Sequence, residues 1–331
     1  MIRHNCPTLG EEEKLAASRV IESRWLAQGI ETSSLEDEFC EYLGLPAGHA
    51  VALSSGTAAL FVALKVLDAG NKSVAYPAYA CSALRNATAM AGGKEVLLDI
   101  LAGTPNLDLD EAAKNRPDIL IAPHLFGIPS KIPHLPGIRV IEDCAQSLGA
   151  KVEDIPVGLQ GDIGIHSFYV SKLMTSGGQG GMLVSKDRSV ADAARDYREF
   201  DCRRDRVPRF NFQMTDLQAA IGRVQLGKLP SFLQRREEIF SRYRQAGLDL
   251  LDSGFSPVRY RAVLKTEHPS SVIEALAKRN IRAIVPIEDW EILGEGFPNA
   301  LSLSRTSVSL PIYPSLSLDA LDSVIEGVLP A

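Results

Sequence analysis

The fold of this chain is decided by the stretch IGIHSFYVSKLMTSGGQGG, residues 163–181. It opens with the apolar run Ile163–Phe168, reaches Lys172 and ends in the glycine-rich run Gly177–Gly181. The apolar run predicts a buried strand. A lysine beyond such a strand, near glycines that let the backbone approach a ligand, stands where a Schiff-base nucleophile would be needed. An isolated lysine is usually a surface residue, so other parts of the sequence must support this interpretation.

Six further apolar runs predict strands, and helical or loop segments separate most of them. They are Ala50–Leu53, Val74–Tyr76, Glu95–Ile100, Ile119–Ala122, Arg139–Ile141 and Met182–Val184. Continuous apolar strands that alternate with helices are typical of a parallel sheet covered on both faces. The sequence therefore predicts an α/β fold with a mostly parallel sheet flanked by helices.

Helical periodicity marks both ends of the chain. The first ~45 residues predict two helices, with Ser34 as the candidate N-cap of the second. A long helical pattern covers residues 215–245, and Gly227 or Pro230 predicts a break in it. Alternating strand and helix patterns follow. We therefore expect a large domain with an N-terminal helical segment over residues 1–240 and a small C-terminal α+β domain over residues 241–331.

Composition and charge limit the possible functions. The net charge of −6 gives no support to a nucleic-acid-binding surface. The five cysteines form no CxxC pair and the six histidines form no HExxH motif, so we expect neither a disulfide framework nor a metal site. The N-terminal residues lack a signal-peptide pattern, and no stretch has the apolar length to span a bilayer. We expect a reduced, cytoplasmic protein with no nucleic-acid or membrane partner.

Polar groups follow three of the predicted strands, and ligands of open α/β sheets bind beyond the carboxyl ends of strands. The turn Ser54–Thr57 leads into a helix, which suits a phosphate but is also an ordinary N-cap. Glu142 and Asp143 end another strand, where an acid either caps the next helix or faces a cationic ligand atom. Together with Lys172, these are the groups that pyridoxal phosphate needs.

The chain resembles the DegT/StrS-type sugar aminotransferases, which are fold type I pyridoxal-phosphate enzymes, over most of its length. The matching motifs are LSSGTAAL (53–60), PAY (77–79), HLFG (124–127), EDCAQSLGA (142–150), SF before Lys172 (167–168), FNF (210–212) ahead of QAA (218–220), and SLPIYPSL (309–316). The Asp-x-Ala-Gln and Ser-Phe-x3-Lys motifs are highly specific together, in this order and spacing.

The resemblance implies a role for each matching residue. Lys172 would form the Schiff base and move the proton, Asp143 would pair with the pyridine nitrogen, and Gln146 would hydrogen-bond the phenolic oxygen. The cofactor would be contacted further by Ser55, Gly56, Thr57, Tyr79, Cys81 and Ser167. From the neighbouring subunit, Asn211 would reach the phosphate, so the resemblance implies a homodimer whose sites are completed in trans.

The sequence departs from the family pattern at four places. Cys81 stands where relatives place an aromatic ring over the cofactor, so that Tyr79 or a small group would cover it instead. Gln179 lies in a glycine-rich stretch about one residue longer than usual, Gln213 replaces a frequent arginine, and 286–290 replaces a histidine-containing motif.

We therefore expect a pyridoxal-phosphate-dependent aminotransferase. It would move an amino group from an amino acid, with glutamate expected, to a keto sugar linked to a nucleotide. The alternatives are a transferase or lyase that uses this cofactor on another carbonyl substrate, and a regulatory protein that binds the cofactor.

Overall fold

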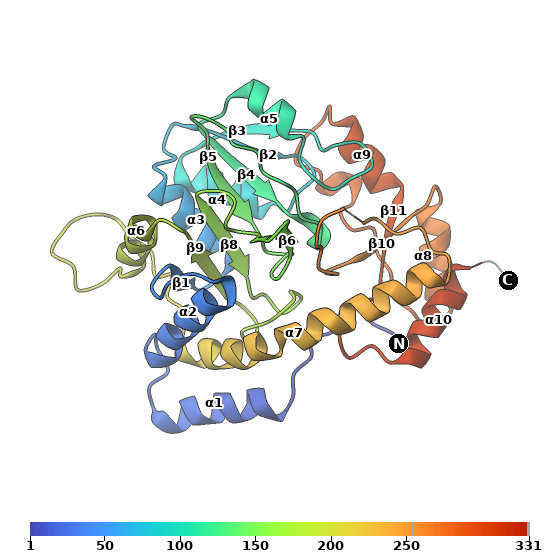
Figure 1. The fold of residues 1–331 in the computed structure, drawn as a ribbon, viewed down its shortest axis with the longest axis horizontal. Coiled ribbons are helices and arrows are strands. Elements are labelled where there is room, and N and C mark those ends of the chain that lie inside the picture. Colours follow the sequence, from blue (N-terminus) through green and yellow to red (C-terminus); the bar gives the residue numbers. More distant parts are fainter. Residues whose placement is uncertain (253, 330–331) are drawn as a thin grey trace.

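The computed structural model describes residues 1–252 and 254–329, and its centre is a seven-stranded sheet with helices on both faces (Figure 1). Across the sheet the strands follow the order β1 (Ala50–Leu53), β9 (Gly181–Val184), β8 (Ile163–Ser167), β5 (Arg139–Asp143), β4 (Ile119–Pro123), β2 (Ser73–Pro77) and β3 (Lys94–Leu98). β9 is antiparallel to both of its neighbours, and the other pairs are parallel. The predicted α/β fold with a mostly parallel sheet is confirmed.

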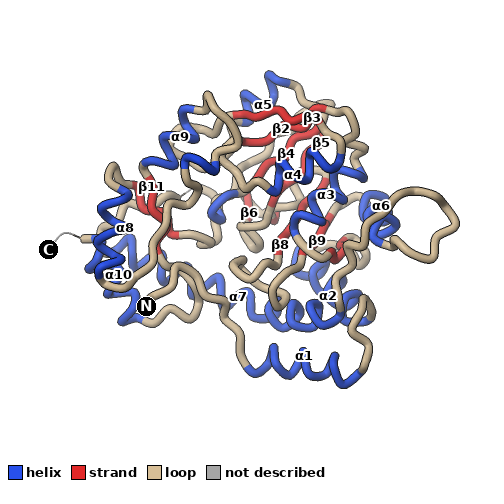
Figure 2. Tube along the Cα trace, turned by 180° about the vertical axis from the view of Figure 1, so that it is seen from behind, coloured by secondary structure: helices blue, strands red, loops and turns tan. Residues whose placement is uncertain are grey.

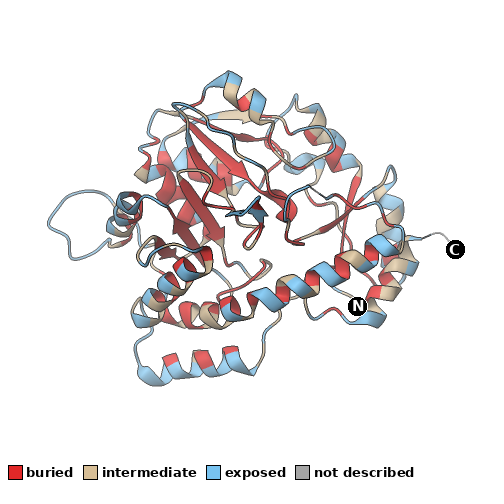
Figure 3. Ribbon diagram, in the orientation of Figure 1, coloured by how far each residue is buried: buried red, intermediate tan, exposed pale blue. Residues whose placement is uncertain are grey.

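The sheet is covered on both faces, and the strands β1, β4 and β9 are buried along their whole length. One face packs against three helices, α3 (Gly56–Val66), α4 (Ala83–Ala91) and α6 (Arg188–Arg198). The other face packs against α2 (Ile30–Leu43), α5 (Leu109–Asn115) and α7 (Asp216–Gln245). In β1, Val51 and Leu53 belong to the first core while Ala50 and Ala52 belong to the second. Figure 3 shows the central strands as buried.

The helix α2 is capped by a residue far along the chain. It begins at Ile30 and not after Ser34, so the predicted N-cap is wrong. The N-cap is Gly29, which has no side chain to satisfy the first N–H groups. Asp216, at the start of α7, does so instead: its Oδ1 accepts hydrogen bonds from Gly29 N at 2.7 Å and Thr32 N at 3.0 Å. A carboxylate there also meets the positive end of the helix dipole.

The helix α7 is continuous over 30 residues and includes Pro230, so the predicted break is wrong. Proline removes one backbone hydrogen bond, but packing on both sides of Pro230 holds the helix together. Its first half buries Ala220 against α1 (Glu11–Ser23), and its second half buries Phe240 in the C-terminal core. The helix therefore crosses residue 240, and the proposed domain division there stays a prediction.

The C-terminal part is a small α+β unit. It pairs β10 (Ala262–Lys265) with β11 (Ser307–Leu310) and packs them with α8 (Pro269–Lys278), α9 (Pro298–Arg305) and α10 (Leu318–Val328). The N-terminal segment joins this unit, because Ile2 forms a parallel bridge with Ile281.

The remaining regular elements are short. They are the hairpin β6 (Lys151–Val152) and β7 (Ile155–Pro156), and the 3-10 turns η1 (Leu125–Gly127) and η2 (Asp289–Glu291). A long loop between α6 and α7 projects from the body of the molecule, and Figure 2 shows it from behind. Within 1–252 and 254–329, no helix is both long and apolar enough to cross a membrane.

Candidate active site

An open cleft of about 860 Å³ lies at the carboxyl ends of β4, β5 and β8 and beside the start of α3. It brings together eight residues that the sequence analysis singled out: Ser55, Gly56, Thr57, Cys81, Asp143, Gln146, Ser167 and Lys172. Parallel strands carry their carboxyl ends to one edge of the sheet, which explains why residues far apart in sequence meet there.

The turn between β1 and α3 presents a helix N-terminus at the cleft. Ser55 is the N-cap of α3, and its Oγ accepts a hydrogen bond from Ala58 N at 3.0 Å. Gly56 lies so close to β8 that a Cβ atom added there would be 2.7 Å from Ser167 Cβ. Any other residue would push these two segments apart. The free N–H groups and the positive end of the helix dipole suit a phosphate.

Asp143 ends β5 with its carboxylate at the cleft. Its Oδ1 accepts one hydrogen bond, from Ala145 N at 2.9 Å. Burial raises the pKa of Asp143, while the Ala145 N–H and the positive charge of Lys172 act in the opposite direction. A buried carboxylate in this position gains from a cationic partner. A protonated pyridine nitrogen would supply one.

Gln146 is held by the turn η1. Its Oε1 accepts a hydrogen bond from Phe126 N at 2.7 Å, which identifies this atom as the amide oxygen. The turn is tight: φ is +61° at Phe126 and +85° at Gly127, and a Cβ on Gly127 would lie 1.9 Å from Val258 O. Because the oxygen is already used, the amide nitrogen is the group that can donate to a ligand in the cleft.

Lys172 sits on the loop between β8 and β9, and its backbone N donates to Tyr169 O at 2.8 Å. Its Nζ lies 5.4 Å from the centroid of the Tyr260 ring, which is a cation–π contact. Although burial alone would raise it, the pKa of Tyr260 is lowered, chiefly by the charges of Lys172 and Arg261. The lysine therefore faces the cleft with its charge stabilised by a π-face.

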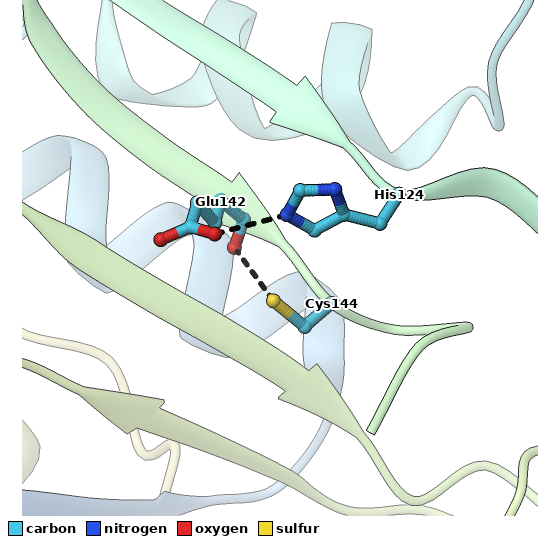
Figure 4. A group of neighbouring side chains, drawn as sticks. All are labelled: His124, Glu142 and Cys144. Carbon is cyan, nitrogen blue, oxygen red and sulfur yellow. Dashed lines mark hydrogen bonds and ion pairs between the residues drawn. The ribbon is translucent and has the colours of Figure 1, made fainter. Parts of the chain in front are cut away.

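A buried hydrogen-bond network surrounds Glu142, the neighbour of Asp143 in β5 (Figure 4). Glu142 Oε2 accepts from His124 Nε2 at 2.9 Å, and Ser130 N donates to His124 Nδ1 at 3.1 Å, so the imidazole proton is on Nε2. The backbone N–H groups of Gly158, Gln160 and Gly161 also donate to Glu142. Burial alone would raise the pKa of Glu142, but the bond from His124 and these N–H groups lower it.

The same network includes Cys144, whose Sγ lies 3.8 Å from the Glu142 backbone oxygen. His124, Glu142 and Cys144 bring their possible ligand atoms within 4.8 Å of one another. Both imidazole nitrogens and both carboxylate oxygens are already engaged in hydrogen bonds. The cluster therefore fixes the ends of β4 and β5, and metal binding would have to break these bonds.

Of the predicted cofactor residues, Tyr79 and Asn211 do not line the cleft, whereas Cys81 does. Tyr79 is fully buried, with its ring edge-on to Phe126 at 6.1 Å, in a core behind the cleft wall. Cys81 lies in the cleft wall and is exposed. Asn211 is exposed on the projecting loop, where its Oδ1 accepts a hydrogen bond from Gln213 N at 3.1 Å. The roles assigned to these three residues stay predictions.

The cleft also contains residues to which the sequence analysis assigned no role. His124, Tyr169 and Gln179 are among its lining residues. Two of these lie in the decisive stretch itself: Tyr169 follows the strand and Gln179 lies within the glycine run. Their position relative to Lys172 was the signal that could have identified them.

A mostly parallel sheet that brings a loop lysine, a strand-end acid and a helix N-terminus to one edge is the arrangement of fold type I pyridoxal-phosphate enzymes. The fold agrees with that of the aminotransferase TlmJ from Streptoalloteichus hindustanus, with a TM-score of 0.91, 28% identity, and 99% and 98% of the two chains covered. DesV of S. venezuelae, solved with a ketimine intermediate, gives a TM-score of 0.89 at 28% identity over 96% and 93%.

The sequence comparisons identify the family. The model of the DegT/DnrJ/EryC1/StrS aminotransferase family matches residues 7–329, so the chain belongs to this family. A Saccharopolyspora spinosa protein, dTDP-4-dehydro-2,3,6-trideoxy-D-glucose 4-aminotransferase, is 30% identical over 96% of this chain and 93% of its own. The family predicted from the motifs is confirmed.

Proposed function

We propose that the protein is a pyridoxal-phosphate-dependent aminotransferase that moves an amino group from an amino acid, with glutamate as the expected donor, to a nucleotide-linked keto sugar. The observation that carries the proposal is the convergence of Lys172, Asp143 and the helix N-terminus at Gly56 on one cleft. The similarity to the S. spinosa 4-aminotransferase supports the sugar as the amino acceptor.

The residues of the cleft fit the cofactor. When bound, pyridoxal phosphate would withdraw electrons from the carbon next to the transferred nitrogen. Gly56, Thr57 and Ser167 would hold the phosphate, with Ser55 as the helix cap. Asp143 would keep a proton on the ring nitrogen.

Two further residues would act on other parts of the cofactor. The Gln146 amide nitrogen would donate to the phenolic oxygen. Lys172 Nζ would attach the cofactor. Once released, it would carry the proton between the substrate carbon that bears the nitrogen and the cofactor carbon bonded to the same nitrogen.

The acceptor would enter over Cys81. Its thiol is small and exposed in the cleft wall, while Tyr79 is buried behind that wall. Since the wall presents a small side chain, we propose that the substrate approaches the cofactor face more closely than in relatives with a ring there.

The proposal is tested by reducing the cofactor-loaded protein with borohydride and mapping the peptides. The cofactor should be found on Lys172, and the loaded protein should aminate dTDP-linked 4-keto sugars with glutamate. Lys172→Ala should lose the label and the turnover, whereas Lys186→Ala, a matched exposed lysine, should keep both. A label on another lysine would refute the assignment. Amination of non-sugar carbonyls alone would favour the alternative substrate class.

We also propose a cytoplasmic homodimer in which Asn211 completes the partner's phosphate site. Asn211 is exposed on a projecting loop and does not line its own chain's cleft, which supports a role in trans. The free cysteines suit a reducing compartment.

Mixing two inactive variants tests the dimer. Lys172→Ala and Asn211→Ala together should regain partial activity, because one site of the mixed dimer receives both intact residues. No recovery, once subunit exchange has been verified, would contradict the role in trans.

A further inference from the structure

A second cavity, of about 310 Å³, lies beside the loop that carries Lys172. Three separate parts of the chain build it: the N-terminal segment, the Lys172 loop and the C-terminal unit. Its lining residues are His4, Asn5, Ser171, Tyr260, Arg261 and Ile312. The N-terminal segment is tied down there, because Asn5 Nδ2 donates to Ser171 O at 2.7 Å. We call this space the Arg261 cavity.

The guanidinium of Arg261 has only neutral side-chain partners. Its Nη1 lies 3.3 Å from His4 Nε2 and 3.3 Å from Ser309 Oγ. Its Nε is buried and finds no hydrogen-bond partner among the described residues. Within the same residues, no carboxylate lies within 4 Å of this guanidinium. An arginine at a cavity wall, with guanidinium N–H groups that lack an acceptor, can donate hydrogen bonds to an anion.

His4 leaves the positive charge of the cavity unbalanced. Burial, together with the charges of Arg261, Arg282 and Arg236, lowers the pKa of His4 to about 3. The imidazole is therefore neutral, and its Nε2 lies 2.9 Å from the Ser309 hydroxyl and 3.3 Å from Arg261 Nη1.

A second arginine adds to the positive charge around the cavity. Arg236 is buried and donates to the backbone oxygens of Arg259, Tyr260 and Ile312, which are neutral acceptors. The surroundings of the cavity therefore carry more positive than negative charge.

The Arg261 cavity lies beside Lys172, with the Tyr260 ring next to both cations. The ring centroid of Tyr260 lies 5.5 Å from Arg261 Cζ and 5.4 Å from Lys172 Nζ. The two cations therefore lie within about 11 Å of each other. An amino acid carries its nitrogen and its carboxylates on one short chain, so it can place nitrogen near Lys172 and a carboxylate near Arg261.

We infer that the Arg261 cavity is the subsite for a carboxylate of the amino donor, with Arg261 as the specificity-determining residue and Asn5 and His4 as its walls. The inference rests on the proposed aminotransferase function. A phosphate of the sugar nucleotide shares the anionic chemistry. The cavity is small and offers one guanidinium, which favours the carboxylate.

The test uses the cofactor-loaded protein and two ligands that lack an amino group, glutarate and dTDP. In calorimetry, Arg261→Gln should weaken glutarate binding at least about tenfold, the effect of losing one charged hydrogen bond, and should leave dTDP binding unchanged. Arg282→Gln is the matched control, since it removes a neighbouring positive charge outside the cavity wall. Arg261→Lys, which keeps the charge, should recover part of the binding.

Several results would overturn the inference. Unchanged glutarate binding in Arg261→Gln is one, and weakened binding of dTDP alone is another, because it assigns the cavity to the nucleotide. If Arg261→Gln does not fold, protection of Arg261 from phenylglyoxal by glutarate in the wild-type protein replaces it, and no protection refutes the subsite. A wild-type protein that binds glutarate through Arg261 but transfers no amino group would refute the proposed function alone.

Discussion

Replacing Glu142 with glutamine should destabilise the protein without touching the ligand cleft directly. The Glu142 carboxylate accepts five hydrogen bonds: Oε2 from His124 Nε2, Gly158 N and Gln160 Nε2, and Oε1 from Gln160 N and Gly161 N. Glutamine has the same shape but turns one acceptor into an N–H donor. His124 cannot compensate by moving its proton, because its Nδ1 already accepts from Ser130 N.

The size of the effect follows from the donors left without an acceptor. Whichever way the amide is turned, at least two buried N–H groups face its NH2 group. An unsatisfied buried donor costs about 1–3 kcal/mol. Relief of the buried charge offsets part of this cost. We therefore expect Glu142→Gln to lower the free energy of unfolding by about 3 kcal/mol.

Urea unfolding followed by circular dichroism measures this change. Glu153→Gln is the matched control, because Glu153 is exposed and, among the described residues, forms an ion pair only with the exposed Lys131, at 2.6 Å. Its stability should stay within experimental error of wild type. The pKa of Glu142 is lower in the folded protein than in the unfolded chain, where it is about 4.5. The carboxylate therefore contributes fully to the free energy of unfolding above pH 4.5, and this contribution disappears as the pH falls through the pKa of the folded state. A loss below about 1 kcal/mol at pH 7 would show that the network does not bear on stability as argued.

Three further predictions concern the cleft and the core. Asp143→Asn should keep cofactor absorbance but lose turnover by orders of magnitude, since the ring nitrogen loses its partner; normal turnover would exclude that pairing. His166 is buried, and burial lowers its pKa to about 3 from 6.5 despite the charge of Glu142. The contribution of His166 to stability should therefore fall by up to about 1.4 kcal/mol per pH unit below pH 6.5, and His166→Phe should remove this share while that of His4 remains; an unchanged slope in urea titrations would count against it. Cofactor should protect Cys81 from alkylation, and equal labelling with and without cofactor would place the thiol away from it.

Local patterns were enough to predict the sheet and most of the site. The runs at β1, β5 and β8 are apolar enough to be strands, and parallel strands place their following residues at one edge. Gly56, Asp143 and Lys172 could therefore be predicted to meet. Glu142 was identified only as an acid at a strand end, because nothing local reveals that the N–H groups of Gly158 to Gly161 fold back onto it.

The predictions failed where a distant residue decides local structure. Ser34 looks like an N-cap, but Asp216 supplies the cap from another helix and moves the start of α2 to Ile30. Pro230 looks like a helix break, but packing along α7 outweighs the one hydrogen bond it removes. The Arg261 cavity depends on contacts such as that between His4 and Arg261, which are 257 residues apart. No periodicity in the sequence signals such a contact.

The cap that Asp216 provides has a consequence for synthesis on the ribosome. Thr32 and Asp216 are 184 residues apart. At about 5–20 residues per second, α2 is made roughly 10–40 s before its cap leaves the ribosome. The strand β1 is also made well before its pairing partner β9, which begins only at Gly181. During that interval the newborn chain presents apolar surface and an unpaired strand edge, which favour aggregation.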